Sequence, residues 1–103
     1  MITVSVMYPK TDSSTFDMDY YLQKHMKLVH QRWDPMGLRN ARVLSGQKGP
    51  DGAEPPFAVM AILDFESLEA FGKAAGEHGP ELFGDIPNFT NVQPQLQISE
   101  IVG

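Results

Sequence analysis

His25 is the residue of this sequence best placed to do chemistry. It stands at the centre of the apolar stripe of a predicted helix that begins after Asp17 and ends near Met36-Gly37. The stripe contains Met18, Leu22, His25, Val29 and Met36. Burial favours the neutral form of an imidazole, and a neutral imidazole beside a gap between helix and sheet could transfer a proton to or from a bound molecule. A core histidine that bonds a backbone carbonyl, Tyr20 or Tyr21 is the more frequent outcome of such spacing, and it stays open here.

The other polar candidates have simpler explanations. His30 lies about 140° around the helix from His25, so the two cannot share a face, and we expect His30 to be solvated. His78 stands at a predicted helix end, where a cation complements the last carbonyls. Asp85 precedes Ile86-Pro87-Asn88, a typical turn sequence. His78 acts on a ligand only if its loop folds towards the His25 cavity, and turn chemistry alone accounts for Asp85.

An aromatic and thioether lining would suit a flat apolar ligand, although such side chains are core residues by default. The predicted lining consists of Tyr21, Leu22, Val29, Trp33, Phe57, Met60, His78 and Phe83.

Composition excludes several classes of protein. The 103 residues predict one domain, 1–103, without room for a separate cofactor domain. The absence of cysteine excludes disulfides, thiolate metal sites and cysteine nucleophiles, and a net charge of −5 argues against nucleic acid. There is no phosphate-binding loop, no metal-ligand spacing and no residue that requires a cofactor, although one histidine could ligate haem. With no targeting or membrane segment, we expect a cytoplasmic protein.

The elements that must position His25 follow from periodicity. We predict strands over 2–8, 38–47, 57–63 and 92–102, with a Gly- and Pro-rich hairpin over 46–56. The helix from Asp17 lies between the first two strands. A second helix, capped by Asp64 or Ser67, is expected to end at Gly76 and Gly79, with a short helical turn starting at Pro80.

The order strand, helix, strand, strand, helix, strand predicts an α+β, ferredoxin-like βαββαβ domain: a four-stranded antiparallel sheet with both helices on one face. Residues 57–63 are apolar on both faces, so the second face of the sheet also needs a cover. A second copy of the chain would provide it, and we expect a homodimer.

Three stretches carry a resemblance to a known family. They are the opening strand with Tyr8-Pro9, the segment Phe16-Asp17-x-x-Tyr20-Tyr21-x-x-x-His25, and the run Asp85-Ile86-Pro87-Asn88-Phe89-Thr90-Asn91, which continues into Gln93-Pro94 and the final strand. In this order and spacing the chain resembles the EthD family, named for a gene associated with ethyl tert-butyl ether degradation. The resemblance implies a dimeric α+β barrel with a cavity between helices and sheet, His25 as its polar residue, and Asp85 in the loop that closes it.

Relatives on this barrel include cofactor-free muconolactone isomerases, polyketide cyclases, decarboxylases and monooxygenases. One departure concerns the cavity entrance. Family members often continue the helix motif as His-x-Pro-Leu, whereas this chain has His25-Met26-Lys27-Leu28, and loss of the proline should straighten the helix locally.

Two functions from different classes remain open. The first is a small cofactor-free enzyme that acts by proton transfer on an apolar cyclic or aromatic metabolite, as an isomerase, cyclase, dehydratase or decarboxylase. His25 is then the general acid/base, and Asp85 or His78 polarises or closes the site. The second is a non-catalytic protein that binds a small hydrophobic ligand or assists a degradative oxygenase system.

Overall fold

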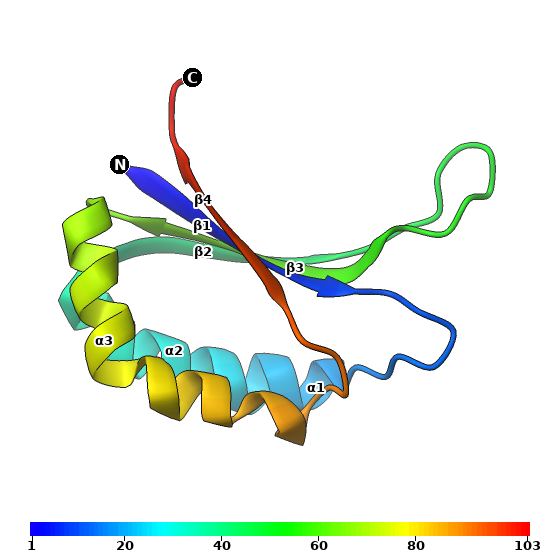
Figure 1. Ribbon diagram of the computed structural model, residues 1–103, viewed down its shortest axis with the longest axis horizontal. Helices are drawn as coiled ribbons and strands as arrows, with labels where there is room; N and C mark the ends of the chain where they lie inside the picture. Colours follow the sequence, from blue (N-terminus) through cyan, green and yellow to red (C-terminus); the bar gives the residue numbers. More distant parts are fainter.

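The computed structural model describes residues 1–103 as one antiparallel sheet with a layer of helices on one side (Figure 1). The strands are β1 (Ile2–Pro9), β2 (Leu38–Ser45), β3 (Phe57–Phe65) and β4 (Gln95–Glu100), in the order β2-β3-β1-β4. Neighbouring strands are all antiparallel. This order, with both helical segments on one face, confirms the predicted ferredoxin-like fold. No helix is long and apolar enough to span a membrane.

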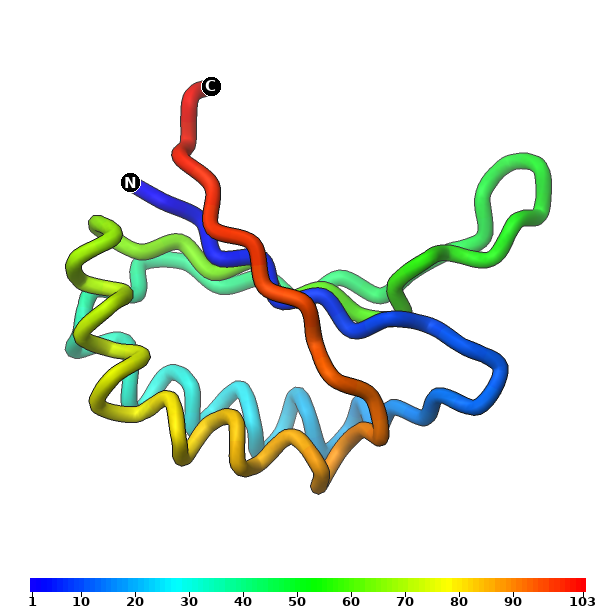
Figure 2. The backbone as a smooth tube through the Cα atoms, viewed as in Figure 1, coloured from blue at the N-terminus to red at the C-terminus, as the bar shows by residue number.

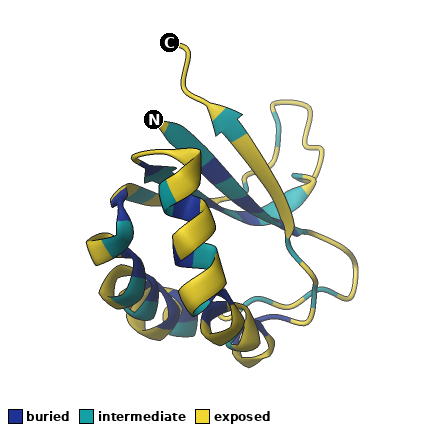
Figure 3. Cartoon of the chain, turned by 60° about the vertical axis from the view of Figure 1, so that its left-hand side comes forward, coloured by how far each residue is buried: buried dark blue, intermediate teal, exposed yellow.

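Strict alternation in β1 decides which face of the sheet is the core. Val4, Val6 and Tyr8 point to the helices and are buried, and their partners on β3 are Leu63, Ala61 and Val59. These residues form the floor on which the helices pack. The helix surfaces that face away from the sheet are exposed (Figure 3).

The outer face of the sheet has an apolar centre. It consists of side chains in register on the three adjacent strands β2, β3 and β1: Leu44, Met60, Ile62 and Met7. Polar residues surround it; for example, Thr3 donates a hydrogen bond to Asp64 at 2.7 Å. Residues 57–63 are therefore apolar on both faces, as the sequence indicated.

The first helical segment changes its winding where His25 lies. Asp17 caps α1 (Met18–Tyr20) by accepting a hydrogen bond from the Tyr20 N–H, and a π-helical turn, η1 (Tyr21–His25), follows. In this turn the N–H of Met26 bonds the carbonyl of Tyr21, five residues back. From there α2 (Met26–Trp33) is regular, and the short η2 (Asp34–Met36) leads to Gly37. Single π turns of this kind occur frequently at functional sites.

The second helix is longer than predicted. Ser67 caps α3 as expected, but α3 (Leu68–Gly84) passes through Gly76, Gly79 and Pro80 without a break. Neither glycine adopts the left-handed conformation that ends a helix, which Gly37 does adopt at φ 105° after η2. Pro80 removes one hydrogen bond to the carbonyl of Gly76, and Gly76 is exposed, so water can take that bond instead.

Two glycines of α3 have no steric reason to be glycine. A Cβ added to Gly72 or Gly76 meets no atom within 4 Å. We therefore expect Gly72→Ala and Gly76→Ala each to raise the free energy of unfolding by about 0.5–1 kcal/mol, because alanine restricts the unfolded chain and favours helix. Urea denaturation measures this. Gly37→Ala is the control: its φ is positive and its Cβ would lie 3.0 Å from that of Ala70, so it should destabilise. Loss of stability in both α3 variants would contradict the expectation.

A clasp joins the start of the first helical segment to the chain before β4. We use this name for residues 13–17 and 89–91, which are held by an isolated bridge between Phe16 and Thr90. Thr90 Oγ1 donates to the carbonyl of Thr15 at 2.6 Å, and the N–H of Asp17 donates to the carbonyl of Phe89 at 2.7 Å. In Figure 2 the chain before β4 (orange) meets the start of the first helical segment (blue) here. The clasp brings residues 85–89 against His25.

Candidate active site

His25 and Asp85 form a pair at the junction of the two helical segments. Nδ1 of His25 lies 2.9 Å from Oδ2 of Asp85, and only 7% and 14% of the two side chains is exposed. His25 comes from the π turn η1, and Asp85 follows the last residue of α3. The two residues are 60 positions apart in the chain, so the fold alone brings them together.

The other carboxylate oxygen of Asp85 has two donors. The Tyr20 hydroxyl donates to Oδ1 at 2.6 Å, and Nδ2 of Asn88 donates to the same atom at 2.9 Å. Oδ2 is left for Nδ1 of His25, which must carry its proton to donate to a carboxylate. The neutral ring then has its lone pair on Nε2.

Nε2 faces open space. It has no hydrogen-bond partner within the protein, and every fully buried polar side-chain atom in the structure has one. His25 lines a cavity of about 30 Å³ between the helices and the sheet. That volume holds a water molecule or two. The remaining lining is apolar apart from the hydroxyls of Tyr8 and Tyr21, because the indole N–H of Trp33 donates to the carbonyl of Ala74.

Aromatic rings fix the imidazole in place. Tyr21 stacks on His25 with ring centroids 5.2 Å apart, and the Phe89 ring lies 4.7 Å away on a tilted plane. Phe89 also contacts Tyr8 and Phe16. The ring has little freedom to turn, so Nε2 stays directed at the cavity.

Several residues predicted from the sequence meet in this site, and others do not. Four of the predicted lining residues, together with His25, line the cavity or its mouth: Tyr21, Val29, Trp33 and Phe83. Asp85 joins them through His25.

Four predicted residues lie elsewhere. Leu22 is 43% exposed, because the wide π turn keeps Tyr21 over His25 and rotates Leu22 off the stripe. Met60 points to the outer face, since its neighbours Val59 and Ala61 occupy the core face. Phe57, at the start of β3, is outside the cavity lining. His78 lies within α3 because that helix does not end at Gly79, and its nearest charged partner is Glu77 at 3.8 Å.

Sequence reasoning missed the residues that hold Asp85. The family motifs include Tyr20, Asn88 and Phe89, but the residue patterns offer Tyr20 only as a partner of His25 itself and Asn88 only as a turn residue. They predict no role for Phe89 or Met26 in the site. The available signal was the spacing of Tyr20 and His25, five residues apart in one helix, together with the Asp-x-x-Asn of residues 85–88.

Burial and hydrogen bonding act on these groups in opposite senses. Burial lowers the pKa of His25, and the hydrogen bond and charge of Asp85 offset part of that effect. Burial alone would raise the pKa of Asp85, but hydrogen bonds from Tyr20, Asn88 and His25 together lower it. The bond to Asp85 raises the pKa of the Tyr20 hydroxyl. Burial raises the pKa of Tyr8 to about 12. A neutral imidazole beside an ionised carboxylate is therefore the resting state near neutral pH.

These pKa directions predict how stability depends on pH. Because the pKa of His25 is lower in the folded protein, the unfolded chain binds the proton first as the pH falls. The free energy of unfolding should therefore decrease below about pH 6.5, the unperturbed pKa of histidine. His25→Gln should lack this component, and His30→Gln, at an exposed position, should keep it. Urea denaturation from pH 8 to 5 measures the difference. A wild-type protein that gains stability over this range, relative to His25→Gln, would contradict the assigned direction.

Metal ligands do not gather anywhere in the structure: no three His, Asp or Glu side chains lie close enough to hold an ion together. The His25 cavity, at about 30 Å³, has no room for a porphyrin in this conformation.

Comparison with known proteins shows which family the chain belongs to. No family model and no curated protein matches the chain. A crystal structure of an EthD-like protein from Ralstonia eutropha JMP134 is 41% identical to it, and the alignment covers 99% of this chain and 92% of the other, with a TM-score of 0.92. The chain belongs to the EthD-like family.

More distant structures share the fold. An ethyl tert-butyl ether degradation (EthD) family protein from Bacillus halodurans C-125 is 20% identical to this EthD-like chain over 99% of both chains, with a TM-score of 0.75. A protein described as dimeric and ferredoxin-like, from an uncultured marine organism, is 13% identical over 100% of this chain and 96% of its own, with a TM-score of 0.57. The resemblance read from the three sequence motifs is thus confirmed.

Proposed function

We propose that this EthD-like protein is a small cofactor-free enzyme that moves a proton on an apolar cyclic or aromatic substrate, with His25 as the general base. The observation that carries the proposal is the His25–Asp85 pair, 2.9 Å long, whose free Nε2 faces an apolar cavity. Buried titratable groups with shifted pKa values are concentrated at functional sites. The lowered pKa of His25 keeps its imidazole neutral near neutral pH, so Nε2 can accept a proton.

The chemistry that this geometry supports is proton abstraction next to a carbonyl. The Nε2 lone pair takes the proton of a C–H bond, and the electrons of that bond become the double bond of an enolate whose charge rests on the carbonyl oxygen. His25 is then an imidazolium that Asp85 stabilises, and it returns the proton to the same carbon or another one. Isomerisation follows directly. Cyclisation, dehydration and decarboxylation begin or end with the same transfer.

The cavity must widen to admit such a substrate, and its mouth contains the side chains able to move. Phe83 and Leu96 both line it and are 40% and 44% exposed. Phe83 belongs to the last turn of α3, beyond Pro80, where the helix has lost a hydrogen bond. Displacement of the Phe83 ring opens the cavity towards solvent and leaves the His25–Asp85 pair in place.

Deuterium exchange tests the proposal without knowledge of the natural substrate. 2-Tetralone, an apolar bicyclic ketone with acidic C–H bonds beside its carbonyl, serves as the probe in D₂O at neutral pD. Proton NMR should show faster loss of those C–H signals with the protein than with buffer alone. Binding of 2-tetralone at the His25 cavity with no acceleration of exchange would favour the other candidate, a non-catalytic binding or accessory protein.

We further propose that the protein is a homodimer joined through the outer face of the sheet. The apolar centre of that face, formed by Met7, Leu44, Met60 and Ile62, supports this, as does the dimeric description of one structural neighbour. Ile62→Lys should therefore shift the molecular mass from dimer to monomer in light scattering coupled to gel filtration. Gln31→Lys, at an exposed position of α2 away from the outer face of the sheet, is the control for added charge, and a wild-type monomer at micromolar concentration contradicts the proposal.

A further inference from the structure

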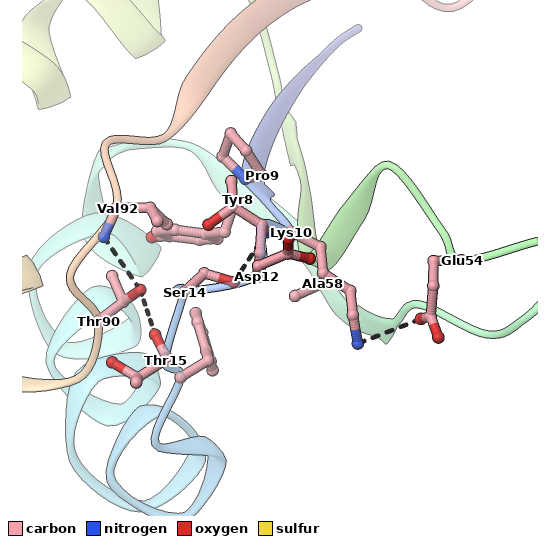
Figure 4. A pocket seen from close by; sticks show the side chains of 12 residues that line it. Tyr8, Pro9, Lys10, Asp12, Ser14, Thr15, Glu54, Ala58, Thr90 and Val92 are labelled. Atoms are coloured by element: carbon pink, nitrogen blue, oxygen red, sulfur yellow. Dashed lines mark hydrogen bonds and ion pairs between the residues drawn. The ribbon is translucent and has the colours of Figure 1, made fainter.

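A second, larger cavity lies on the other side of Tyr8. It measures about 500 Å³ and is enclosed by the end of β1, the loop that follows it, the hairpin between β2 and β3, and residues 90–92 (Figure 4). This volume falls within the range of about 300–1,000 Å³ that is usual for small-molecule sites. Nothing in the proton-transfer chemistry of His25 accounts for it.

Tyr8 belongs to the lining of both cavities. Only 2% of the residue is exposed, and a side-chain hydrogen bond with Tyr21 offsets part of the rise in its pKa that burial causes. One side chain therefore forms the boundary between an apolar compartment with His25 and a larger polar one.

The lining of the outer cavity is rich in hydroxyl groups. Two of them are already used within the protein. Ser14 Oγ bonds the backbone of Thr11, and Thr90 Oγ1 donates to the carbonyl of Thr15. The hydroxyls of Thr11 and Thr15 and the carboxylate of Asp12 have no partner and remain available to a ligand. Aromatic and aliphatic side chains form the rest of the wall: Tyr8, Phe16, Ala58 and Val92.

The charges of the outer cavity disfavour an anionic ligand. Lys10 Nζ lies 3.4 Å from Glu54 Oε2 across the cavity, as the dashed line in Figure 4 shows. A ligand anion would face Asp12 and Glu54 in a chain of net charge −5, and the one cation of the lining, Lys10, is already paired with Glu54. Free hydroxyls and a carboxylate instead match a neutral group with several O–H donors.

We infer that the outer cavity binds the hydroxylated part of the substrate whose apolar ring reaches His25, so that the substrate class is a neutral ring compound with a polyhydroxyl substituent. This inference rests on the proposed function of the His25 site, and it assigns the outer cavity as a second binding subsite for the same substrate. Tyr8, which lines both cavities, lies where the two parts of the substrate join.

Two naphthyl compounds test the inference by isothermal titration calorimetry. 2-Naphthol has only the aromatic ring and one hydroxyl, and 2-naphthyl β-D-glucopyranoside adds a neutral sugar to it. The wild-type protein should bind the glucoside with a Kd at least 10-fold lower than that of the naphthol. Thr15→Val is isosteric and Asp12→Asn removes only charge, so both should fold, and each should reduce that gain. Asp19→Asn, exposed on α1 and outside both cavities, is the matched control and should preserve it.

Equal affinities for the two compounds, or no binding of the glucoside, would overturn the inference. So would a gain that Thr15→Val and Asp12→Asn leave intact, because the sugar would then be bound elsewhere. These outcomes are separate from the 2-tetralone exchange, which depends on His25 alone: active exchange with no gain for the glucoside removes the outer subsite and leaves the proposed function standing.

Discussion

The His25→Gln variant should lose about 10²–10⁴-fold of the rate at which the wild-type protein exchanges protons on 2-tetralone or on its natural substrate, the range typical of a positioned acid or base. Glutamine is close to histidine in size, so it fills the space beside Tyr21 and Phe89 although it has no ring to stack on them. It has no basic nitrogen, so the proton has no acceptor. The measurement is the initial exchange rate by proton NMR, with circular dichroism to verify the fold.

His30→Gln provides the matched control for this loss. His30 undergoes the same chemical change, but its side chain is half exposed and pairs only with Asp34, at 2.9 Å. The control should exchange at the wild-type rate. The exchange rate of Asp85→Asn should lie between those of His25→Gln and His30→Gln. The amide oxygen still accepts a hydrogen bond from Nδ1, but it has no charge to stabilise the imidazolium. Full activity in His25→Gln would show that His25 is a structural residue.

The largest effect on stability is expected from Phe89→Ala. Phe89 is 3% exposed and lies within 6.3 Å, between ring centroids, of each of its five ring partners: Tyr8, Phe16, Tyr20, Tyr21 and His25. Its removal leaves a void among rings that three segments of the chain contribute, and such a site collapses poorly. The free energy of unfolding should decrease by about 3–5 kcal/mol.

Phe83→Ala is the matched control, since it deletes the same atoms from a side chain that is 40% exposed at the cavity mouth. It should cost no more than about 1 kcal/mol. Urea denaturation followed by the fluorescence of Trp33, which lies in the core away from this cluster, measures both variants. Similar losses in the two variants would mean that the aromatic cluster around His25 is not a centre of stability.

The sequence predicted the elements well where a local pattern decides them. Period-two alternation located β1, and the caps Asp17 and Ser67 located both helix starts. Gly37 ended the first helical segment as expected, since its positive φ is a local requirement. The dense apolar run of β3 correctly indicated a strand with two apolar faces.

The errors arose where tertiary contacts override local preference. Gly79-Pro80 is a strong stop signal, but α3 continues because packing of Leu82 into the core holds its last turn. Leu22 fits the inner face of an ideal helix, and only the π turn moves it out. Periodicity located His25, but no spacing could show that Asp85, 60 residues away, would meet its Nδ1. The family resemblance indicated Asp85, and the supporting bonds from Tyr20 and Asn88 appear only in three dimensions.

The hairpin between β2 and β3 lies, in the sequence, between the two groups of residues that form the His25 site. Its loop, residues 46–56, extends away from the sheet and the helices (Figure 2) and is largely exposed, so a cut there would leave the core intact. The first fragment would hold the base His25 with Tyr20, and the second would hold Asp85 with Asn88 and Phe89. Neither fragment alone possesses the pair. The protein is thus a natural candidate for split-protein complementation, in which recovered proton exchange reports that two separately expressed halves have joined.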